Sequence, residues 1–425
     1  MSKAEGVACK KANKDPEART NVEWRSEPLG AVCEFINRGI SPTYLESGGI
    51  AVLNQKCVRD HAVNFDLGRR HDVAVKRVSP ERLVRVGDVL VNSTGTGTLG
   101  RVAQIREAPP ESATVDSHVT IVRPLQGLFY TEFFGYALIA IENQIQEGGE
   151  GCGGQTELSR AKLANDYRVS FPSDIDTQRR IVAILDEAFE AIATAKAHAE
   201  QNLRNVMDVF AHHREAALSG DASWSEATLS ELCDIKHGYA FEGEFFADSG
   251  EHVLLTPGSF HEAGGFRDRG DKTKYFTGSI PPAFVLDEGD LLVAMTEQAA
   301  GLLGSPLLVP ESGRYLHNQR LGKVIGKPDV PWFNGFFFHV FNLMRVRQEI
   351  HDSASGAKVR HTSPGKIGAV RVRYPRSREV QQAATNRLDD LHGECQRLAA
   401  IYQRKIAALD ELKQSLLHQA FTGQL

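Results

Sequence analysis

Most of the sequence is present twice, in two copies that follow one another along the chain. The run Gly87–Val91 returns 202 residues later as Gly289–Val293, with a glycine, an aspartate and three apolar residues in both copies. The dipeptide Phe171–Pro172 returns 203 residues later as Tyr374–Pro375. Because the offset barely changes between these matches, they indicate one duplicated module, and the period is too long for a solenoid. Each copy should be a domain-sized unit, and two similar units suit a partner with two similar halves.

The bulk composition is that of an ordinary globular protein. The chain has 425 residues, of which 41% are hydrophobic and 24% are charged, so it is long enough for roughly two to three cores. No uninterrupted apolar stretch reaches the length of a membrane span, and we expect no contact with a membrane. The first residues are polar and lysine-rich, which predicts a disordered leader over 1–23 rather than a signal peptide.

Cysteine usage and charge narrow the class of protein further. The six cysteines are scattered without a C-x-x-C pair, so we expect a reduced, cytoplasmic protein with no metal site. The formal net charge of −5 excludes a protein that is coated with positive charge. Any surface for nucleic acid must therefore be local or be completed by partner proteins.

Each copy has two parts of different character. The first part, over 24–175 and again over 221–376, is rich in glycine, turn residues and short β-branched runs. Runs such as Val119–Val122 are typical of short strands, whereas 133–146 and 332–350 have the apolar spacing of inserted helices. The predicted fold class is therefore α+β, with two mixed α/β domains.

The second part of each copy, over 176–220 and 377–425, contains no proline and little glycine. Apolar residues recur there at alternating spacings of four and three, which is typical of the seam of a coiled coil. Asn202 and Lys405 interrupt the two seams at equivalent positions, where a polar side chain can set the register or simply reach solvent. The predicted seam residues are Leu185, Ile192, Ala199, Leu391, Leu398, Tyr402, Leu409, Leu412 and Leu416.

Two helices of this length predict a long spacer. A helix of about 40 residues spans roughly 60 Å. If the two helices pair antiparallel, the two domains lie at opposite ends and are related by an internal pseudo-twofold axis. We therefore expect two long antiparallel coiled-coil helices that separate the two domains.

Three further segments resemble the specificity subunit of type I restriction–modification systems. Gln178–Asp186 is similar to that family's entry into its central helix, and Leu412–Leu425 is similar to its C-terminal signature. Gly87–Gly100 resembles a segment of its target recognition domains. The second copy departs from this segment, because Ala294–Glu297 follows its Gly-Asp run. Different residues are expected at this point if the two domains read different bases.

The resemblance implies a non-catalytic DNA-binding subunit. It implies that 24–175 and 221–376 are target recognition domains, each of which reads one half of a split target in double-stranded DNA. It implies that two methyltransferase subunits dock along the helical segments, methylate adenine at N6 with S-adenosylmethionine, and are joined by restriction subunits in the full complex. This chain itself would then hold no cofactor. A related methyltransferase-only or fused restriction system is the alternative within the same family.

One motif in the sequence could indicate chemistry of its own. Gly95, Gly97 and Gly100 form a G-x-G-x-x-G motif, but a nucleotide fingerprint needs a helix after the glycines. The alternating run Arg101–Ile105 predicts a strand instead. No P-loop or metal-ligand spacing is present, and neither Pro-Pro pair stands beside the polar residue that an adenine methyltransferase needs. A fused methyltransferase–endonuclease and a coiled-coil adaptor without DNA specificity remain as rival hypotheses.

Candidate DNA contacts are basic, amide and hydroxyl residues in glycine-rich or loop segments, because these side chains match phosphates and base edges. The stretch 353–376 is the strongest cluster, since it is basic and its loop contains no acid. Phosphate contacts should outnumber base contacts among the candidates. The candidates are Arg59, Arg69, Arg70, Lys76, Arg77, Asn92, Thr94, Thr96, Arg101, Arg267, Arg269, Lys272, Lys274, Lys358, Arg360 and Arg373.

Overall fold

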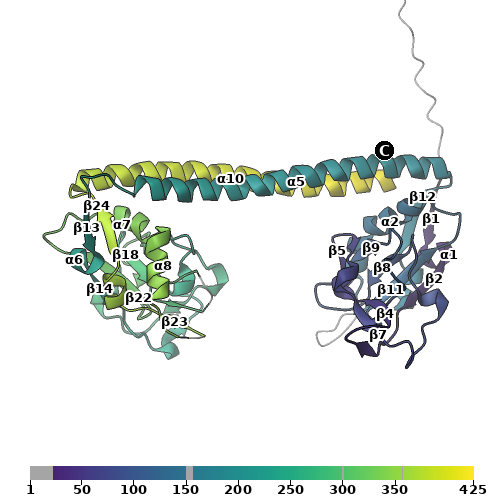
Figure 1. The fold of residues 1–425 in the computed structure, drawn as a ribbon, viewed down its shortest axis with the longest axis horizontal. Helices are drawn as coiled ribbons and strands as arrows, with labels where there is room; N and C mark the ends of the chain where they lie inside the picture. The colour runs from purple at the N-terminus through teal and green to yellow at the C-terminus, as the bar shows by residue number, and fades with distance from the viewer. Residues whose placement is uncertain (1–22, 150–156, 299–300, 357) are drawn as a thin grey trace, which may run out of the picture. The chain divides into compact units, whose positions relative to one another are not determined.

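The computed structural model describes residues 23–149, 157–298, 301–356 and 358–425 (Figure 1). The chain forms two compact units. The first unit comprises 1–198 and 405–425, and the second comprises 199–404. Each unit therefore contains one globular domain together with part of each of two long helices.

Two four-stranded sheets build the domain of the first unit. In both sheets the neighbours are antiparallel, except that β10 runs parallel to β4. A two-stranded pair leads from this domain into the first long helix, with β1 (Trp24–Pro28) beside β12 (Arg168–Pro172). The sheet orders are β2 (Cys33–Arg38), β11 (Val119–Pro124), β8 (Val89–Asn92), β9 (Val102–Gln104), and β10 (Ala113–Val115), β4 (Ile50–Leu53), β7 (Arg69–His71), β3 (Tyr44–Leu45).

The second unit repeats the order of these two four-stranded sheets. Its first sheet has the same antiparallel order, and its second sheet again contains one parallel pair, β16 with β21. This agreement confirms the internal repeat, because the sheets match in order and direction and not only in composition. The sheet orders are β14 (Cys233–His237), β22 (Leu321–Gly326), β18 (Leu291–Ala294), β20 (Pro306–Leu308), and β21 (Tyr315–Leu316), β16 (His252–Leu254), β17 (Tyr275–Phe276), β15 (Phe246–Ala247).

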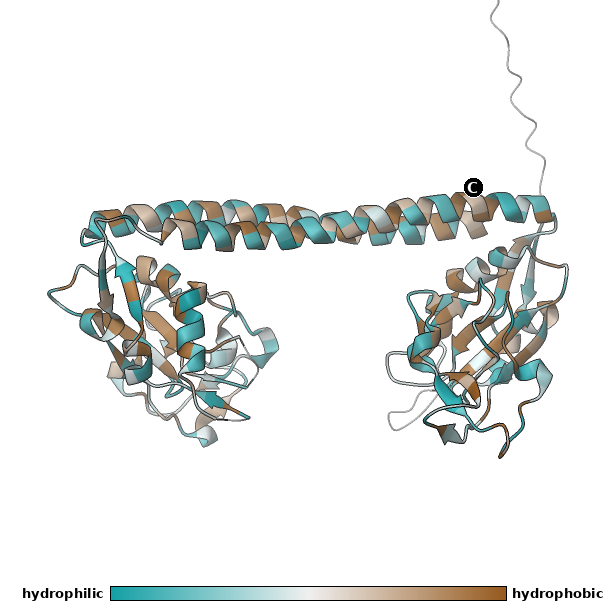
Figure 2. Cartoon of the chain, in the orientation of Figure 1, coloured by the Kyte–Doolittle hydropathy of each residue, from teal (hydrophilic) through white to brown (hydrophobic). Residues whose placement is uncertain are grey.

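In each unit, short helices cover one face of the four-stranded sheet that contains the Gly-Asp strand, β8 or β18. The inserted helix expected over 133–146 is two helices, α2 (Thr131–Ala140) and α3 (Glu142–Glu147). The helix expected over 332–350 is likewise divided into α7 (Asn334–Phe341) and α8 (Met344–Asp352). Phenylalanines of α2 and α7 are fully buried in the main core of their unit, and hydrophobic residues gather on the central strands of each domain (Figure 2). The remaining short helices are α1 (Leu29–Val32), α4 (Arg160–Asn165), α6 (Leu229–Leu232) and α9 (Pro364–Gly368).

The repeated Gly-Asp run has a structural role. Asp88 is buried, and its carboxylate accepts hydrogen bonds from the backbone of Arg85 at 2.8 Å and from Nε of Arg123 at 2.7 Å. In the second unit Asp290 accepts from a backbone N–H at 2.9 Å and from Nζ of Lys323 at 2.5 Å. Each aspartate therefore closes the turn before its strand and binds a cation on the neighbouring strand.

The long helices are α5 (Ile175–Ala217, 43 residues) and α10 (Arg378–Phe421, 44 residues). In the first unit, Nζ of Lys413 lies 5.1 Å from the centroid of the Phe189 ring, and Lys196 binds Asp410 at 2.7 Å. The numbers rise on α5 as they fall on α10, so the two segments are antiparallel. In the second unit, α5 contacts the N-terminal half of α10, for example through the rings of Phe210 and His392, whose centroids lie 4.7 Å apart. The expectation of paired antiparallel helices is confirmed within each unit.

The structure corrects part of the predicted seam. Leu398 and Leu412 are 41% and 47% exposed, so the seam does not pass through them. Asn202 and Lys405 are also exposed, and Leu203 and Ile406 are the partly buried residues beside them. A straight α-helix drifts away from a strict seven-residue repeat by about 20° per heptad, which shifts the contact face by one residue over a long seam. The idea that Asn202 and Lys405 set the register does not fit their exposure. Of the other seam residues, Leu185, Ile192 and Ala199 are buried, and Leu391, Tyr402, Leu409 and Leu416 are partly buried.

Candidate nucleic-acid interface

A buried glutamine anchors each domain to the start of its long helix. The side chain of Gln178 donates to the Pro172 carbonyl at 2.9 Å, and its Oε1 accepts from the backbone N–H of Tyr130 at 2.7 Å. Gln381 stands 203 residues later and donates to the carbonyls of Pro375 at 3.0 Å and Pro331 at 2.9 Å. Both glutamines are fully buried. The last strand of each domain is therefore held rigidly against the helix that follows it.

A second anchor lies two turns further along each helix. In the first unit the hydroxyl of Tyr136 donates to Asp186 at 2.5 Å, and Arg106 donates to the same carboxylate at 3.0 Å. Burial and the neighbouring carboxylate raise the pKa of Tyr136 to about 12. In the second unit the equivalent pair is His339 and Asp389, whose atoms Nε2 and Oδ1 lie 2.9 Å apart. The same position thus carries a phenol in one unit and an imidazole in the other.

In the first unit the structure brings two of the predicted contact segments into one groove. This groove is open and has a volume of about 1010 Å³. Arg59 and Arg101 both line it, and so do Gln55, Lys56 and Thr98. Arg59 is exposed, and Arg101 donates to a turn carbonyl at 2.9 Å. A groove lined by cations together with amide and hydroxyl groups suits a phosphate backbone with base edges beside it.

The remaining basic residues of the first cluster lie outside that groove, on β7 and the segment after it. The guanidinium of Arg69 stacks 3.3 Å above the centroid of the Tyr44 ring. Arg70 pairs with Glu111 at 2.5 Å, and Lys76 donates to a backbone carbonyl at 3.1 Å. Arg77 is exposed. Of the predicted first cluster, Arg59 therefore lines the groove and the other four residues do not.

One predicted DNA contact in the glycine-rich loop after β8 does not fit the structure. Asn92 is fully buried, and its amide donates to the Gln55 carbonyl at 3.2 Å. A side chain in this position cannot reach DNA, so Asn92 supports the loop and does not contact the ligand. Thr94 is partly buried, with its hydroxyl 2.8 Å from Nδ1 of His118, whereas Thr96 is exposed on the turn. The strand β9 follows the glycines, as the alternating pattern predicts, and a dinucleotide fingerprint would need a helix there.

In the second unit the structure brings a whole predicted cluster together. Arg267, Arg269, Lys272 and Lys274 line one groove of about 510 Å³. Arg314 is a fifth cation in this groove, and three aspartates line it as well, so the lining is net positive. Gly258 leaves room for a cation, because a Cβ at this glycine would lie 2.1 Å from Nη1 of the Arg269 guanidinium.

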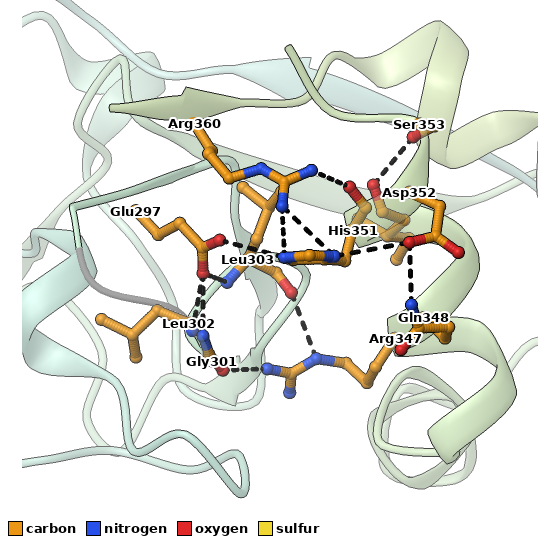
Figure 3. Close-up of polar contacts among 11 residues, drawn as sticks. Glu297, Gly301, Leu302, Leu303, Arg347, Gln348, His351, Asp352, Ser353 and Arg360 are labelled. Atoms are coloured by element: carbon orange, nitrogen blue, oxygen red, sulfur yellow. Dashed lines mark hydrogen bonds and ion pairs between the residues drawn. The ribbon is translucent and has the colours of Figure 1, made fainter. Parts of the chain in front are cut away.

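The cluster over 353–376, the strongest in sequence, is divided by the fold. Lys358 is exposed. Arg360 points inward and donates to the ring and the carbonyl of His351 at 2.5 and 2.6 Å (Figure 3). Arg373 donates to the carbonyls of Ser219 at 2.5 Å and Asp221 at 2.6 Å. It thus binds carbonyl groups just after the C-terminus of α5, where a cation is favoured. The structural contacts of Arg360 and Arg373 leave Lys358 as the candidate of this cluster that extends into solvent.

A buried carboxylate supports the counterpart loop in the second unit and was missed as a site from sequence. Glu297 is 3% exposed, and its Oε2 accepts from the backbone N–H groups of Gly301, Leu302 and Leu303 at 2.9 to 3.0 Å (Figure 3). Arg347 donates to two carbonyls of the same loop. Burial, followed by the charge of Arg214, lowers the pKa of Arg347 to about 10. Glu297 and Arg347 together fix the backbone of this loop.

Two features of other site classes are not found in the part of the chain that the structure describes. Among these residues, no group of three or more His, Cys, Asp or Glu side chains could hold a metal ion. No helix among them combines the length and the apolar character needed to cross a membrane. Across the described residues, the grooves that collect the predicted contacts are cationic and open.

The two domains and the paired long helices define the fold of type I specificity subunits. The chain matches a chain of a type I R-M system, described for its complex assembly and conformational transition, with a TM-score of 0.75 and 16% identity over 96% of this chain and 100% of that chain. It matches the HsdS subunit from Thermoanaerobacter tengcongensis with a TM-score of 0.54 and 16% identity, over 95% of this chain and 97% of that one.

The sequence comparison agrees with this fold. The chain is similar to the specificity subunit of the type I restriction enzyme EcoBI from Escherichia coli, with 24% identity over 235 residues. That match covers 55% of this chain and 44% of the relative, so the chain spans less than half the length of the curated relative that it matches. No protein-family model matches the chain. The expected resemblance to type I specificity subunits is confirmed.

Proposed function

We propose that this protein is the DNA-binding specificity subunit of a type I restriction–modification complex, in which each domain reads one half of a split target in double-stranded DNA. The repetition of one fold with two different cationic grooves carries this proposal. A repeated fold supplies two reading domains of the same geometry, and different linings supply two different half-sites. The cations of the grooves would bind phosphates, because most protein–DNA hydrogen bonds go to the backbone.

The long helices supply the scaffold in this proposal. Two methyltransferase subunits would dock along α5 and α10, and restriction subunits would join them. S-adenosylmethionine would bind the methyltransferase subunits, which would methylate adenine at N6, and this chain would be non-catalytic and cytoplasmic. Because the net charge of the chain is −5, we expect weak DNA binding by the chain alone and tight binding in the complex.

Methylation mapping tests this function. The chain is expressed with its methyltransferase subunits in a host without other adenine methylation, and N6-methyladenine is mapped across the host DNA. The expected result is one split motif with half-sites on one face of the duplex, about one helical turn or 10 bp apart. A control strain without this chain should carry no such motif. A contiguous motif would contradict the proposal.

Exchanging one domain tests the roles of the two halves. Replacement of 24–175 by the corresponding domain of another specificity subunit should change one half-site and leave the other unchanged. An unchanged motif after this exchange would instead support a helical adaptor without DNA specificity. Nuclease activity of the purified complex distinguishes a restriction system from a methyltransferase-only system.

A further inference from the structure

One tight turn occurs at the same place in both domains. In the first unit it joins β10 to β11, and in the second it joins β21 to β22. Oδ1 of Asp116 accepts from the backbone N–H of His118 at 2.9 Å, and Oδ1 of Asn318 accepts from the backbone N–H of Arg320 at 3.0 Å. These are two Asx turns with the same hydrogen bond, and this bond fixes the backbone of the two residues that follow.

The backbone of each turn packs closely against a glycine, which we call the clamp glycine, where no space is left for a Cβ. A Cβ on Gly39 would lie 1.8 Å from the carbonyl oxygen of Val115, and a Cβ on Gly238 would lie 2.3 Å from the carbonyl oxygen of Asn318. The residue after each glycine donates to the backbone just before the turn, from Ile40 at 3.0 Å and from its counterpart in the second unit at 2.9 Å. Both turns are therefore held by the same backbone contacts and should be equally rigid.

The loop after β8 or β18 holds each turn from the other side. Ser93 donates its backbone N–H to the carbonyl of His118 at 2.8 Å, and Met295 donates to the carbonyl of Arg320 at 3.1 Å. These loops contain the counterpart residues Thr94 and Thr296, and Glu297 follows Thr296 in the second unit. Each turn therefore lies against the glycine-rich or Glu297-supported loop of its own domain.

The side chains on this common backbone differ between the domains. The first turn carries Ser117 and His118, and the second carries Gln319 and Arg320. His118, Gln319 and Arg320 are exposed. Within the described residues, no hydrogen bond or ion pair holds the side chains of Gln319 and Arg320. The fold thus presents an amide and a guanidinium on a rigid support without using either of them internally.

A hydrogen-bond chain orients the exposed ring in the first unit. Nε2 of Gln55 donates to the Thr94 hydroxyl at 2.6 Å, and that oxygen lies 2.8 Å from Nδ1 of His118. Since the threonine oxygen accepts from Gln55, its hydroxyl hydrogen is available for Nδ1, and the neutral ring then presents Nε2–H as a donor. Gln55 also lines the cationic groove of this unit, so the turn and the groove are connected.

The second turn has a similar relation to its groove. Tyr315 on β21 lines the cationic groove that contains Arg267 and Lys272. The chain reaches Asn318 three residues later. Arg314, which directly precedes β21, lines the same groove, so a cation that can bind phosphate stands just before the strand that leads into a turn with free amide and guanidinium groups. Arginine is the usual bidentate partner of guanine, and glutamine is that of adenine.

We propose that the turns 116–118 and 318–320 carry the base-reading side chains, and that the grooves beside them hold the backbone. Arg320 contacts a guanine and Gln319 an adjacent adenine in the half-site of the second domain. His118, oriented by Thr94 and Gln55, donates Nε2–H to a purine acceptor in the half-site of the first domain. This assignment rests on the proposed function, because it names the residues through which the two domains discriminate bases.

The test uses the full chain assembled with its methyltransferase subunits and a pool of duplex DNA of randomised sequence. Arg320→Ala is compared with the groove variant Lys272→Ala, and bound sequences are read. Arg320→Ala should reduce discrimination at one position of one half-site by roughly 5- to 150-fold and leave the other half-site unchanged. Lys272→Ala should weaken binding to all sequences alike and reduce the salt dependence by about one phosphate contact.

A second pair of variants tests whether the first turn reads a base. His118→Ala should relax one position in the other half-site only, and Gln55→Ala should reproduce this effect more weakly because it frees the ring. If Arg320→Ala and His118→Ala leave every position unchanged, or weaken all sequences alike as Lys272→Ala does, the assignment is wrong. These outcomes require that the unaltered complex selects a split sequence. If it selects none, the proposed function itself fails.

Discussion

The two domains share one backbone but stabilise it with different side chains. At the loop after β8, the amide of Gln55 donates to the carbonyl and the hydroxyl of Thr94 in the first unit. At the counterpart loop after β18, the Glu297 carboxylate accepts three backbone N–H groups, and Arg347 binds the carbonyls. A shared backbone with separate internal supports lets the exposed residues of each domain change independently, as the proposed split target would require.

The largest expected effect concerns the glycine that clamps the turn. Gly39→Ala places a Cβ against a backbone carbonyl that cannot move aside, so it should destabilise the first unit by about 3 kcal/mol. Gly238→Ala should destabilise the second unit to a similar degree. Urea unfolding, with one tryptophan reporter retained in each unit, measures both. Gly393→Ala is the control, because nothing lies within 4 Å of its added Cβ. Destabilisation by only one of the two clamp variants would show that the turns are not equivalent.

The buried glutamine anchors give a smaller and unequal pair of effects. Gln178 forms hydrogen bonds through both its amide and its carbonyl, whereas Oε1 of the buried Gln381 has no partner among the described residues. Gln178→Ala should therefore cost about 2–3 kcal/mol and Gln381→Ala about 1 kcal/mol less. Equilibrium unfolding of each single variant measures this difference. Equal losses would mean that Oε1 of Gln381 is satisfied in solution.

Sequence reasoning was successful where the signal is periodic. The repeat and the antiparallel helices follow from offsets and spacings that are maintained over many residues, so single errors average out. The prediction that Leu398 and Leu412 lie on the seam was wrong because it extended a strict heptad pattern along a helix with 3.6 residues per turn. The prediction that Asn92 contacts DNA was wrong because burial at a strand end depends on packing and not on residue type.

Proximity in sequence was a poor guide to which basic side chains are free of internal contacts. The basic stretch 353–376 was the strongest candidate, yet Arg360 and Arg373 bind backbone carbonyls. The turns that we propose as base-reading positions were missed because each adds only one or two polar residues to a short connection. A usable signal is present in the sequence: Asp116 and Asn318 stand two residues before His118 and Arg320, in connections that the repeat aligns. Nothing in the sequence indicates that a distant glycine holds each of these turns.

The smallest expected effect is a difference between the two turns in how the free energy of unfolding depends on pH. Asp116 is 4% exposed, and burial raises the pKa of its carboxyl, whereas Asn318 fills the same role without a charge. A raised pKa in the folded state means that the folded protein binds this proton more tightly than the unfolded chain. The free energy of unfolding therefore falls as pH rises from below about 4 through the pKa of the folded state. The contribution of Asp116 is most favourable when the carboxyl is protonated.

Asp116→Asn should remove this pH dependence and keep the hydrogen bond to the His118 backbone. The variant should match the unaltered protein near pH 3.5 and exceed its stability at neutral pH, by less than about 1 kcal/mol because the amide oxygen replaces the carboxylate as acceptor. Asn318→Asp should show the reverse in the second unit, with a loss at neutral pH that disappears on acidification. Unfolding curves of both variants across this pH range measure the difference. A loss of stability at neutral pH in Asp116→Asn would mean that the carboxylate is stabilised by neighbouring cations, and the two turns would then differ in electrostatics as well as in sequence.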